Sequence, residues 1–519
     1  MHILKYCKKL DHKLPLWLGF TLLLLIVLRI PNFFEPYWYG DEAIYLTIGH
    51  AMNSGARLYA EIVDHKTPLI YFFARVPDQL SFRILLLSWM LVSTLAFSKF
   101  ARFIFRSLLS VQTATLLFVL FTSLPWFEGN IPNGELFVMG FILCALTLLT
   151  HSKAVATFFH ESANSSAKSD ALWIVGAGML LSGAVLTKVP AVFDVAAAGY
   201  LFVLYFLTQK KFTTASFWFA VRSVVWLVLG FCIPILLSIV YFVAIGAGND
   251  YLQFGLLYNF HYSGTWVLNF ASPILSFAYT FLGKAVILCA GIVGTLFFQK
   301  RISKTTLFLF SWTLFALFAS LLSNRPYPHY FLQVLPPLIL LVSSIFEWRK
   351  QPLVKNVSTL VLALTGFTLF MGVLITLHAG LYETQSYYTR FWKLATKQHS
   401  YTEYRNSFNS LMADNYAAAA YLRSSSDPKL FIWGTNPTLY ALAEKQPVGK
   451  FTVSFHIKDL GLYTETMTAV TSYMPQYIVV MHDETTPLPG LDGLLQKNYT
   501  PFAYYAYFSV WRKSSRSTL

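Results

Sequence analysis

Long runs of apolar residues recur along the first three quarters of the chain. Many of them continue for about 18 residues or more, the length that an α-helix needs to cross a bilayer. Hydrophobic residues make up 56% of the 519 residues and charged residues 12%, and the mean hydropathy is +0.53. A soluble globular protein carries about twice that share of charge. This excludes an ordinary soluble enzyme and predicts an α-helical polytopic membrane protein. We expect about eleven transmembrane helices, near residues 14–30, 80–97, 108–124, 135–150, 171–187, 191–208, 223–245, 273–298, 305–323, 331–346 and 357–377.

The basic residues cluster between the apolar runs, in alternate loops. Lys and Arg number 39 against 24 for Asp and Glu, a net charge of +15, which in a soluble protein would suggest a nucleic-acid partner. Here the positive-inside rule accounts for the surplus, and we expect no nucleic acid. One set of loops holds 18 basic residues, and the other short loops hold five, at Arg57, Lys66, Arg75, Lys188 and Arg325. This bias places the N-terminus in the cytoplasm, and an odd number of spans places the C-terminus outside the plasma or inner membrane.

Two polar regions are too long to be simple connections. One is the first outer loop, residues 31–79, which belongs with the spans to a transmembrane domain over 1–379. The other is the tail, 380–519. Within the tail, 416–423 is a helix candidate, and the apolar runs 429–433, 477–481 and 505–511 are typical of strands. We expect the tail to be a small extracytoplasmic α/β domain.

The ionisable residues of the first outer loop fall into two groups, and charge near lipid is costly enough that it usually has a function. Asp41 and Glu42 begin a stretch in which apolar residues 44, 48 and 52 follow a helical period that ends at Gly55. This predicts a short helix at the membrane interface. Asp41 has a simpler interpretation as the N-cap of that helix. The second group, Asp64-His65-Lys66, lies close before the chain becomes apolar again.

Several motifs occur in the same order as in a known superfamily of membrane enzymes. The Asp41-Glu42 pair is followed by a small helix, a turn with Gly55 and Tyr59, and Lys66-Thr67-Pro68-Leu69; later come Thr187-Lys188-Val189-Pro190, Asn324-Arg325, His329-Tyr330 and Pro336-Pro337. In motif order and topology the chain resembles the GT-C glycosyltransferases, in particular the branch of protein O-mannosyltransferases and aminoarabinose lipid A transferases. Thr67 stands where many members have a first proline, and His65 where the aminoarabinose branch often has glutamate.

The resemblance implies an integral membrane glycosyltransferase that moves a hexosyl or pentosyl group from a polyprenyl-phosphate donor to an acceptor hydroxyl outside the cytoplasm, by an inverting single displacement. Such a reaction needs a carboxylate to take the acceptor proton and cations to stabilise the departing phosphate. We expect Asp41 to be the base, and Glu42 either to orient the acceptor or to hold the loop. The residues that we expect at the donor phosphate are Lys66, Arg325, Lys188, His329 and Tyr330.

Each of these residues has a structural alternative. Lys66 fits an interfacial anchor that snorkels from lipid. Arg325 and Lys188 fit exceptions that the positive-inside bias tolerates, and an aromatic belt explains interfacial tyrosines equally well. Four further residues are candidate contacts to the sugar or acceptor, although the last also fits a helix-start carboxylate: Tyr59, Asp64, His65 and Glu135. No regular ligand spacing predicts a metal site or another cofactor, while a divalent metal held by Asp64, His65 and nearby carboxylates stays open.

Two other classes of membrane protein share the predicted spans. A secondary transporter or lipid flippase typically has ionisable residues in mid-membrane and internal repeats. Here Arg83 and Lys284 are the main charges within spans, and no repeat is visible. A non-catalytic membrane assembly protein would suit the polar tail but does not need the charged first loop. The motifs leave open whether the acceptor is a lipid, a polysaccharide or a protein.

Overall fold

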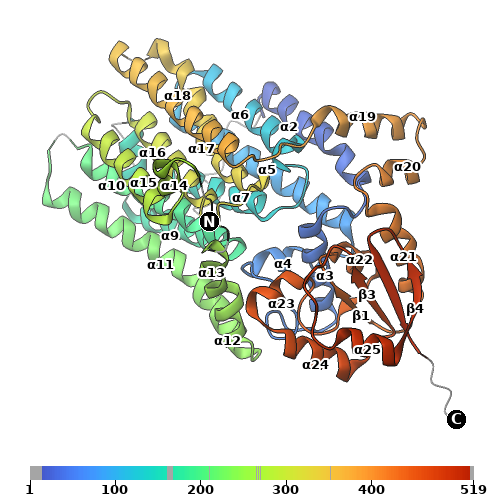
Figure 1. Cartoon of the computed structure of the whole chain (residues 1–519). Helices are drawn as coiled ribbons and strands as arrows, with labels where there is room; N and C mark the ends of the chain where they lie inside the picture. The colour runs from blue at the N-terminus through green and yellow to red at the C-terminus, as the bar shows by residue number, and fades with distance from the viewer. Residues whose placement is uncertain are drawn as a thin grey trace, which may run out of the picture.

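The computed structural model describes residues 14–160, 167–209, 211–264, 266, 268, 270–350 and 352–514. Most of these residues are helical, and one small sheet lies near the C-terminus (Figure 1). The helices form a bundle, and the strands and helices of the C-terminal part, orange to red in Figure 1, lie at one end of it. This confirms the predicted class, a polytopic helical protein with a small α/β part. The predicted cytoplasmic basic tail, residues 1–13, lies outside the described residues.

Each of the eleven predicted spans coincides with an apolar helix. Seven helical segments are long and apolar enough to cross a membrane: α2 with η2 (Leu16–Phe34), α5 (Gln79–Ile104), α9 (Ala167–Thr187, counted from Asp170), η4 with α10 (Val189–Leu207), α11 (Thr214–Ala244), η6 through α17 to η7 (Pro328–Trp348) and α18 (Leu353–Thr376). An eighth is formed if α7 (Gly134–Leu149) and α8 (Lys153–His160), which meet at 82°, make one broken span. The remaining three predicted spans are shorter apolar helices, α6 (Leu108–Ser123), α15 (Phe281–Phe297) and α16 (Lys304–Ser320). The chain is a multi-pass membrane protein.

Helices α9 and α11 pack closely through glycine. A Cβ atom at Gly178 would collide with the backbone of Leu227 in α11, and one at Gly230 would collide with the backbone of Val175 in α9. Small residues let transmembrane helices approach this closely. Van der Waals contacts between the helices then stabilise their association, because in lipid the hydrophobic effect does not drive helices together. The C-terminal half of α11 is exposed, with Val240 at 64%, as a helix that faces lipid requires.

The first outer loop folds into helix α3 (Gly40–Asn53) and the short helix α4 (Leu69–Phe73). The predicted helix is present, but its N-cap residue is Tyr39, and Asp41 lies in the first turn. Gly55, with φ of +96°, turns the chain after the helix, a conformation that favours glycine. Helix α3 is buried on almost every side because α22 (Pro437–Ala443) of the C-terminal part packs on it. Helix α3 is therefore surrounded largely by other parts of the protein.

The C-terminal part builds a five-stranded sheet in the order β2-β1-β3-β5-β4. Strand β1 (Lys429–Trp433) pairs in parallel with β2 (Gln446–Pro447) and β3 (Tyr477–Met481), and β5 (Phe508–Lys513) pairs antiparallel with β3 and β4 (Tyr499–Tyr504). The helices of this part, besides α22, are α19 (Thr384–Ala395), α20 (Tyr401–Asn406), α21 (Met412–Ser424), α23 (Ser454–Leu460), α24 (Tyr463–Tyr473) and α25 (Leu491–Asn498). The strands predicted at 429–433 and 477–481 are confirmed. The last strand begins three residues later than predicted, and the predicted helix 416–423 lies within α21.

The C-terminal part meets the bundle beside the first outer loop. Val63 forms an isolated parallel bridge with Phe451, and the Tyr258 hydroxyl donates to Asp459 Oδ2 at 3.0 Å. Tyr258 begins α13 (Tyr258–Gly264), which follows α12 (Gly248–Asp250) and the π-helical segment η5 (Tyr251–Leu257), while α14 (Pro273–Ala278) precedes α15. The first outer loop, the segment 248–264 and helix α23 therefore meet at one place.

Candidate active site

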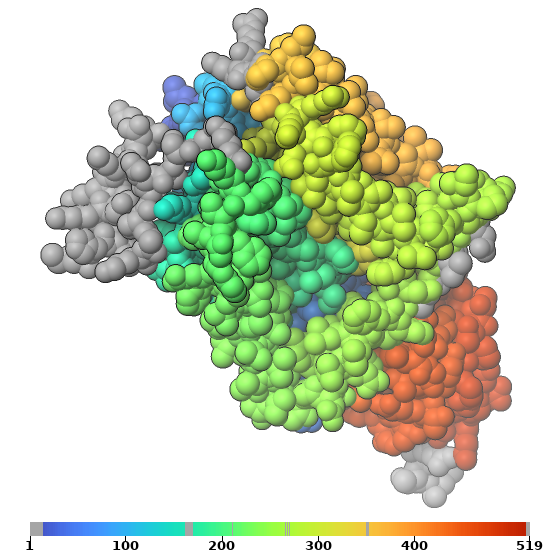
Figure 2. Space-filling view, turned by 90° about the vertical axis from the view of Figure 1, so that its left-hand side faces the viewer, coloured from blue at the N-terminus to red at the C-terminus, as the bar shows by residue number. Residues whose placement is uncertain are grey.

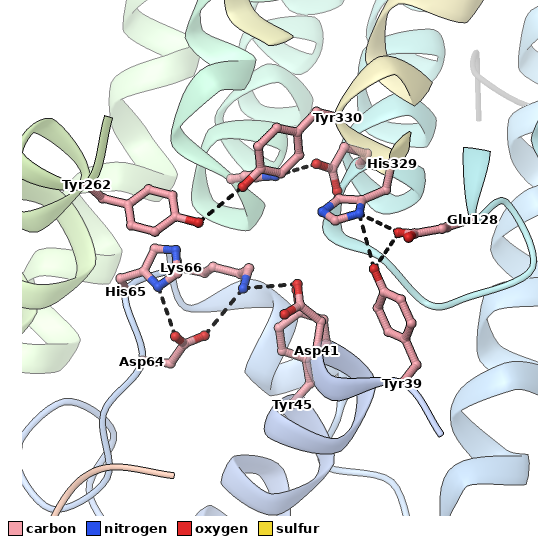
Figure 3. Close-up of polar contacts among 12 residues, drawn as sticks. Tyr39, Asp41, Tyr45, Asp64, His65, Lys66, Glu128, Tyr262, His329 and Tyr330 are labelled. Carbon is pink, nitrogen blue, oxygen red and sulfur yellow. Dashed lines mark hydrogen bonds and ion pairs between the residues drawn. The ribbon is translucent and has the colours of Figure 1, made fainter. Parts of the chain in front are cut away.

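Lys66 stands at the centre of a group of ion pairs (Figure 3). Its Nζ lies 3.3 Å from Asp41 Oδ2 and 3.6 Å from Asp64 Oδ2. Lys66 and Asp64 are buried, whereas the Asp41 side chain keeps 28% of its exposure. Tyr45, one turn further along α3, donates its hydroxyl to Asp41 Oδ2 at 3.1 Å. Asp41 is thus the accessible carboxylate of the group, and two neighbours fix its orientation.

Two buried tyrosines hold the second charged group of the loop in place. The Tyr59 hydroxyl donates to the Lys66 carbonyl at 2.7 Å. The Tyr71 hydroxyl donates to Asp64 Oδ2 at 2.7 Å and accepts from the Lys66 backbone N–H at 3.2 Å. Tyr59 has a φ of +70°, a strained conformation for an aromatic residue that surrounding contacts must maintain. The structure places Tyr59, a predicted sugar contact, beneath the loop, where its ring is fully buried.

Asp41, Asp64 and Lys66 shift one another's pKa values. Burial raises the pKa of the Asp41 carboxyl, but the Lys66 ammonium more than offsets it and holds the pKa below the usual 3.8. Burial also opposes charge on Asp64, and Lys66 together with His65 holds the Asp64 pKa well below that value. Burial lowers the pKa of Lys66, yet the two carboxylates raise it above its usual 10.5. All three groups are charged at neutral pH.

Glu42 belongs to a separate ion pair. Its carboxylate accepts from Arg83 Nε at 2.8 Å and from a terminal Arg83 nitrogen at 2.7 Å, and Gln79 Nε2 donates to it at 2.8 Å. Both members of the pair are almost fully buried, and the bidentate geometry offsets part of the cost of removing them from water. Because Arg83 lies in α5, the pair anchors the start of α3 to a transmembrane helix. Of the two roles predicted for Glu42, this geometry favours holding the loop.

A third polar group joins three segments that are far apart in the sequence. The Glu128 carboxylate accepts from the Tyr39 hydroxyl, and His329 Nδ1 contacts both, lying 3.1 Å from that hydroxyl. In Figure 3 this group lies beside Asp41, on the side opposite His65. His329, predicted at the donor phosphate, is therefore engaged with Glu128. Glu128 and Tyr39 were not among the predicted site residues; a carboxylate before glycine in the short turn between two apolar runs is the signal that points to Glu128.

Lys188 and Tyr330 form the part of the site that belongs to the bundle. Lys188 Nζ forms an ion pair with Glu135 and lies 4.0 Å from the centroid of the Tyr330 ring, a cation–π geometry. The Tyr330 hydroxyl is 3.4 Å from that of Tyr262. Burial lowers the pKa of Lys188, and Glu135 opposes that shift. The Arg325 guanidinium lies 4.2 Å from the centroid of the Tyr262 ring, so Arg325 supports this aromatic residue.

These two parts of the site meet at a cavity of about 350 Å³. Figure 2 shows the surface hollowed between the green helices, the yellow-green segment and the red C-terminal part. The apolar part of the cavity wall includes Val189, Pro190, Val192, Phe193, Phe281 and Leu322. Five of the predicted site residues line its polar part: His65, Lys66, Glu135, Lys188 and Tyr330. A cavity that combines two ammonium groups with an apolar wall suits an amphipathic anion.

The structure also assembles a group of metal-ligating side chains. The ligand atoms of Asp64, His65 and His456 all lie within 4.8 Å of one another, and all three residues are buried. His65 Nδ1 is 3.0 Å from Asp64 Oδ1 and 3.0 Å from His456 Nε2. Burial lowers the pKa of both imidazoles, that of His456 to about 3, so each is neutral and able to ligate.

One oxygen and two nitrogen ligands fit Zn²⁺ or a similar divalent ion with an open position. Such an ion would tie the first outer loop to α23 and add positive charge beside Lys66. His456 was not predicted, because it lies 391 residues from its partner His65. The sequence left open whether a divalent metal binds near Asp64 and His65. With His456 added, such a metal has a defined set of three ligands.

The fold is similar to that of ArnT, in agreement with the predicted resemblance at the level of fold. The structure aligns with that of ArnT from Cupriavidus metallidurans bound to undecaprenyl phosphate, over 96% of this chain and 98% of that one, with 14% identity and a TM-score of 0.55. ArnT in the apo state aligns over 95% and 97%, with 15% identity and a TM-score of 0.54. The Archaeoglobus fulgidus oligosaccharyltransferase gives a TM-score of 0.44 at 13% identity, over 96% of this chain and 74% of that one. The sequence matches no protein-family model and no curated protein.

Proposed function

We propose that this protein is an integral membrane glycosyltransferase that moves a sugar from a polyprenyl-phosphate donor to an acceptor hydroxyl, with Asp41 as the base. One observation carries the proposal. An ionised, partly exposed carboxylate is bound to Lys66, and Lys66 lines a cavity that joins a second ammonium group, Lys188, to an apolar wall. The fold likeness to ArnT, whose structure holds undecaprenyl phosphate, supports a lipid-phosphate donor.

The proposed reaction is a single displacement. The acceptor oxygen forms a bond to C1 of the sugar while its proton passes to an Asp41 carboxylate oxygen. The bond between C1 and the phosphate oxygen breaks, and its electron pair stays on the phosphate, which changes from a singly charged diester to a doubly charged monoester. Lys66 and Lys188 stabilise this added charge. The sugar leaves with inverted configuration at C1, and Asp41 returns its proton to water.

Lys66 links donor binding to the state of the base. In the structure its ammonium is shared between Asp41 and Asp64. A donor phosphate at Lys66 competes with Asp41 for that charge, so the pKa of Asp41 moves up toward its usual range when the donor is bound. Asp41 then becomes a stronger base when there is a sugar to transfer.

The proposed topology rests on the distribution of basic residues. The positive-inside bias puts the N-terminus in the cytoplasm and the first outer loop outside. We assign residues 1–379 to the transmembrane domain and 380–519 to an extracytoplasmic α/β domain. His456 of the second domain contacts His65 of the first outer loop, which supports placing both on the same side of the membrane. The acceptor would therefore approach from outside the cytoplasm.

The proposal can be tested with purified protein in liposomes and a panel of polyprenyl-phosphate sugars, each offered with lipid, saccharide and peptide acceptors, by measuring polyprenyl phosphate released. We expect release by the wild type and by Glu61→Gln, and release at least about 100-fold slower by Asp41→Asn. Glu61 is a matched control because it lies in the same loop and forms an exposed ion pair with Arg57, which contributes little to stability. Equal release by both variants would remove Asp41 as the base. A folded wild type that moves intact donor across the bilayer without consuming it would favour a lipid flippase, and one that does neither would favour an assembly protein.

A further inference from the structure

We propose that a second cavity, of about 400 Å³, is the acceptor site and that it binds a neutral saccharide; this inference rests on the proposed function. The cavity lies between Trp38, which precedes α3, and three other segments. These are the turn before α7, the start of α19 and the residues just after α20. Its lining includes Trp38, Glu128, Tyr382, Arg390 and Phe408. Its volume falls in the range of roughly 300–1,000 Å³ that is typical of small-molecule sites.

Three aromatic side chains form one wall of this acceptor cavity. The Trp38 ring lies 5.8 Å from that of Tyr382 and 5.6 Å from that of Phe408, measured between centroids, at interplanar angles of 68° and 41°. Tyr382 keeps 40% of its exposure. Tilted aromatic faces of this kind pack against the C–H faces of a sugar ring, while their polar atoms remain available for hydrogen bonds.

Polar groups surround the aromatic wall. Arg390 donates from one terminal nitrogen to the Ser407 carbonyl at 2.8 Å, whereas its buried Nε has no hydrogen-bond partner among the described residues. Glu383 and Ser386 also line the cavity. Sugar hydroxyls both donate and accept, so they can use the carboxylates and the guanidinium together.

The charges of the cavity select against an anionic ligand. Its lining holds two carboxylates, Glu128 and Glu383, and one cation, Arg390. A phosphorylated headgroup would face a net negative lining, whereas in the donor cavity two cations, Lys66 and Lys188, accompany one carboxylate, Glu135. The two cavities therefore differ in the way that a transferase requires, one for an anionic lipid donor and one for a neutral acceptor.

The position of the acceptor cavity relative to Asp41 fits this assignment. Trp38 lies three residues before Asp41, and Glu128, which lines the cavity, is bound to Tyr39 and His329 beside Asp41. In Figure 3 Glu128 and Lys66 lie on opposite sides of Asp41. A saccharide held against Trp38 and a donor phosphate held at Lys66 would thus approach the same carboxylate from two sides.

Saturation-transfer NMR on the full chain in nanodiscs tests the assignment without any need for turnover. The probes are methyl α-mannoside, methyl β-glucoside and N-acetylglucosamine, with a serine/threonine peptide as competitor. We expect at least one glycoside to bind, and Tyr382→Ala to weaken that binding about fivefold to tenfold. Tyr382→Phe keeps the ring and should restore binding. Trp392→Ala is the matched control, because Trp392 lies in α19, which begins two residues after Tyr382, is 64% exposed and is not part of the lining.

The result separates this inference from the proposed function. Polyprenyl-phosphate binding should be the same in the wild type and in the three variants, and equal binding also shows that all of them are folded. Glycoside signals that are absent, or equal in wild type and Tyr382→Ala, would overturn the saccharide assignment even if donor turnover is observed. Displacement of the glycoside by the peptide at lower concentration would assign the cavity to a protein acceptor instead. Donor turnover that fails while glycosides bind at Tyr382 would count against the transferase alone.

Discussion

Replacing Lys66 with methionine removes one ammonium group while keeping most of the side-chain volume, and the structure allows its cost to be worked out. Lys66 neutralises two carboxylates, at 3.3 Å and 3.6 Å. Breaking a buried ion pair by removing one partner costs about 3–5 kcal/mol. We expect about 3 kcal/mol, the lower end, because the Asp41 side chain is 28% exposed and water can solvate part of its charge.

The same substitution should impair the reaction in two ways. Loss of one preorganised charge at the leaving phosphate should slow transfer about 10²–10³-fold. Because Lys66 holds the pKa of Asp41 below 3.8, its removal should raise that pKa. The acid limb of the pH–rate profile should therefore move to higher pH, since the base is protonated earlier as pH falls.

Thermal unfolding and polyprenyl phosphate release, measured on the same nanodisc samples, test this prediction. Lys458→Met is the matched control, because Lys458 pairs with Glu484 at 2.9 Å and its side chain is 30% exposed. We expect Lys66→Met to unfold at lower temperature and to turn over far more slowly than Lys458→Met. If the two variants unfold at the same temperature and release polyprenyl phosphate at the same rate, the ion pairs of Lys66 contribute to neither stability nor catalysis, and the reasoning is refuted.

Three further predictions follow from the same contacts. Glu42→Gln breaks the buried pair with Arg83 and should lower the free energy of unfolding by about 3–5 kcal/mol, seen as a lower Tm, while the folded fraction binds donor normally. His456→Ala should abolish stoichiometric Zn²⁺ binding measured by metal analysis after dialysis, and chelator should lower the Tm of wild type alone; no bound metal in the wild type would contradict this. Because the pKa values of Asp41 and Asp64 are depressed in the folded protein, their contribution to stability is complete above about pH 4 and is lost as pH falls through the folded pKa values. Tm should fall below that pH, and Asp64→Asn should flatten the decline.

The sequence predicted the helices because their apolar runs are long, and a bilayer requires such runs whatever the tertiary structure. The strands at 429–433 and 477–481 were equally clear, since each is a short buried apolar run with turns on both sides. The last strand was misplaced by three residues, because 505–507 are aromatic and small residues that form the turn between β4 and β5. Local composition could not distinguish that turn from the strand.

The site was predicted less completely, for a physical reason. Asp41 was selected because a carboxylate at a membrane face is costly. Lys66 was selected because a departing phosphate needs a cation and because Lys66-Thr67-Pro68-Leu69 resembles an element of the superfamily. Their 3.3 Å contact depends on how α3 and the following loop fold together, which their separation along the chain does not determine. Glu42 was expected either to orient the acceptor or to hold the loop, and only the tertiary contact with Arg83 of α5 distinguishes these two roles. His456 and Glu128 join the site through tertiary contacts alone.

Single-turnover kinetics of Asp41→Asn, with saturating donor prebound, test the central claim most directly. Donor affinity should stay within about threefold of wild type, because Lys66 and Lys188 are retained. The rate of sugar transfer should fall at least about 100-fold, the usual contribution of a general base, and Asp41→Glu should recover part of it. A transfer rate within tenfold of wild type, or a loss explained wholly by weaker donor binding, would contradict the assignment of Asp41 as the base.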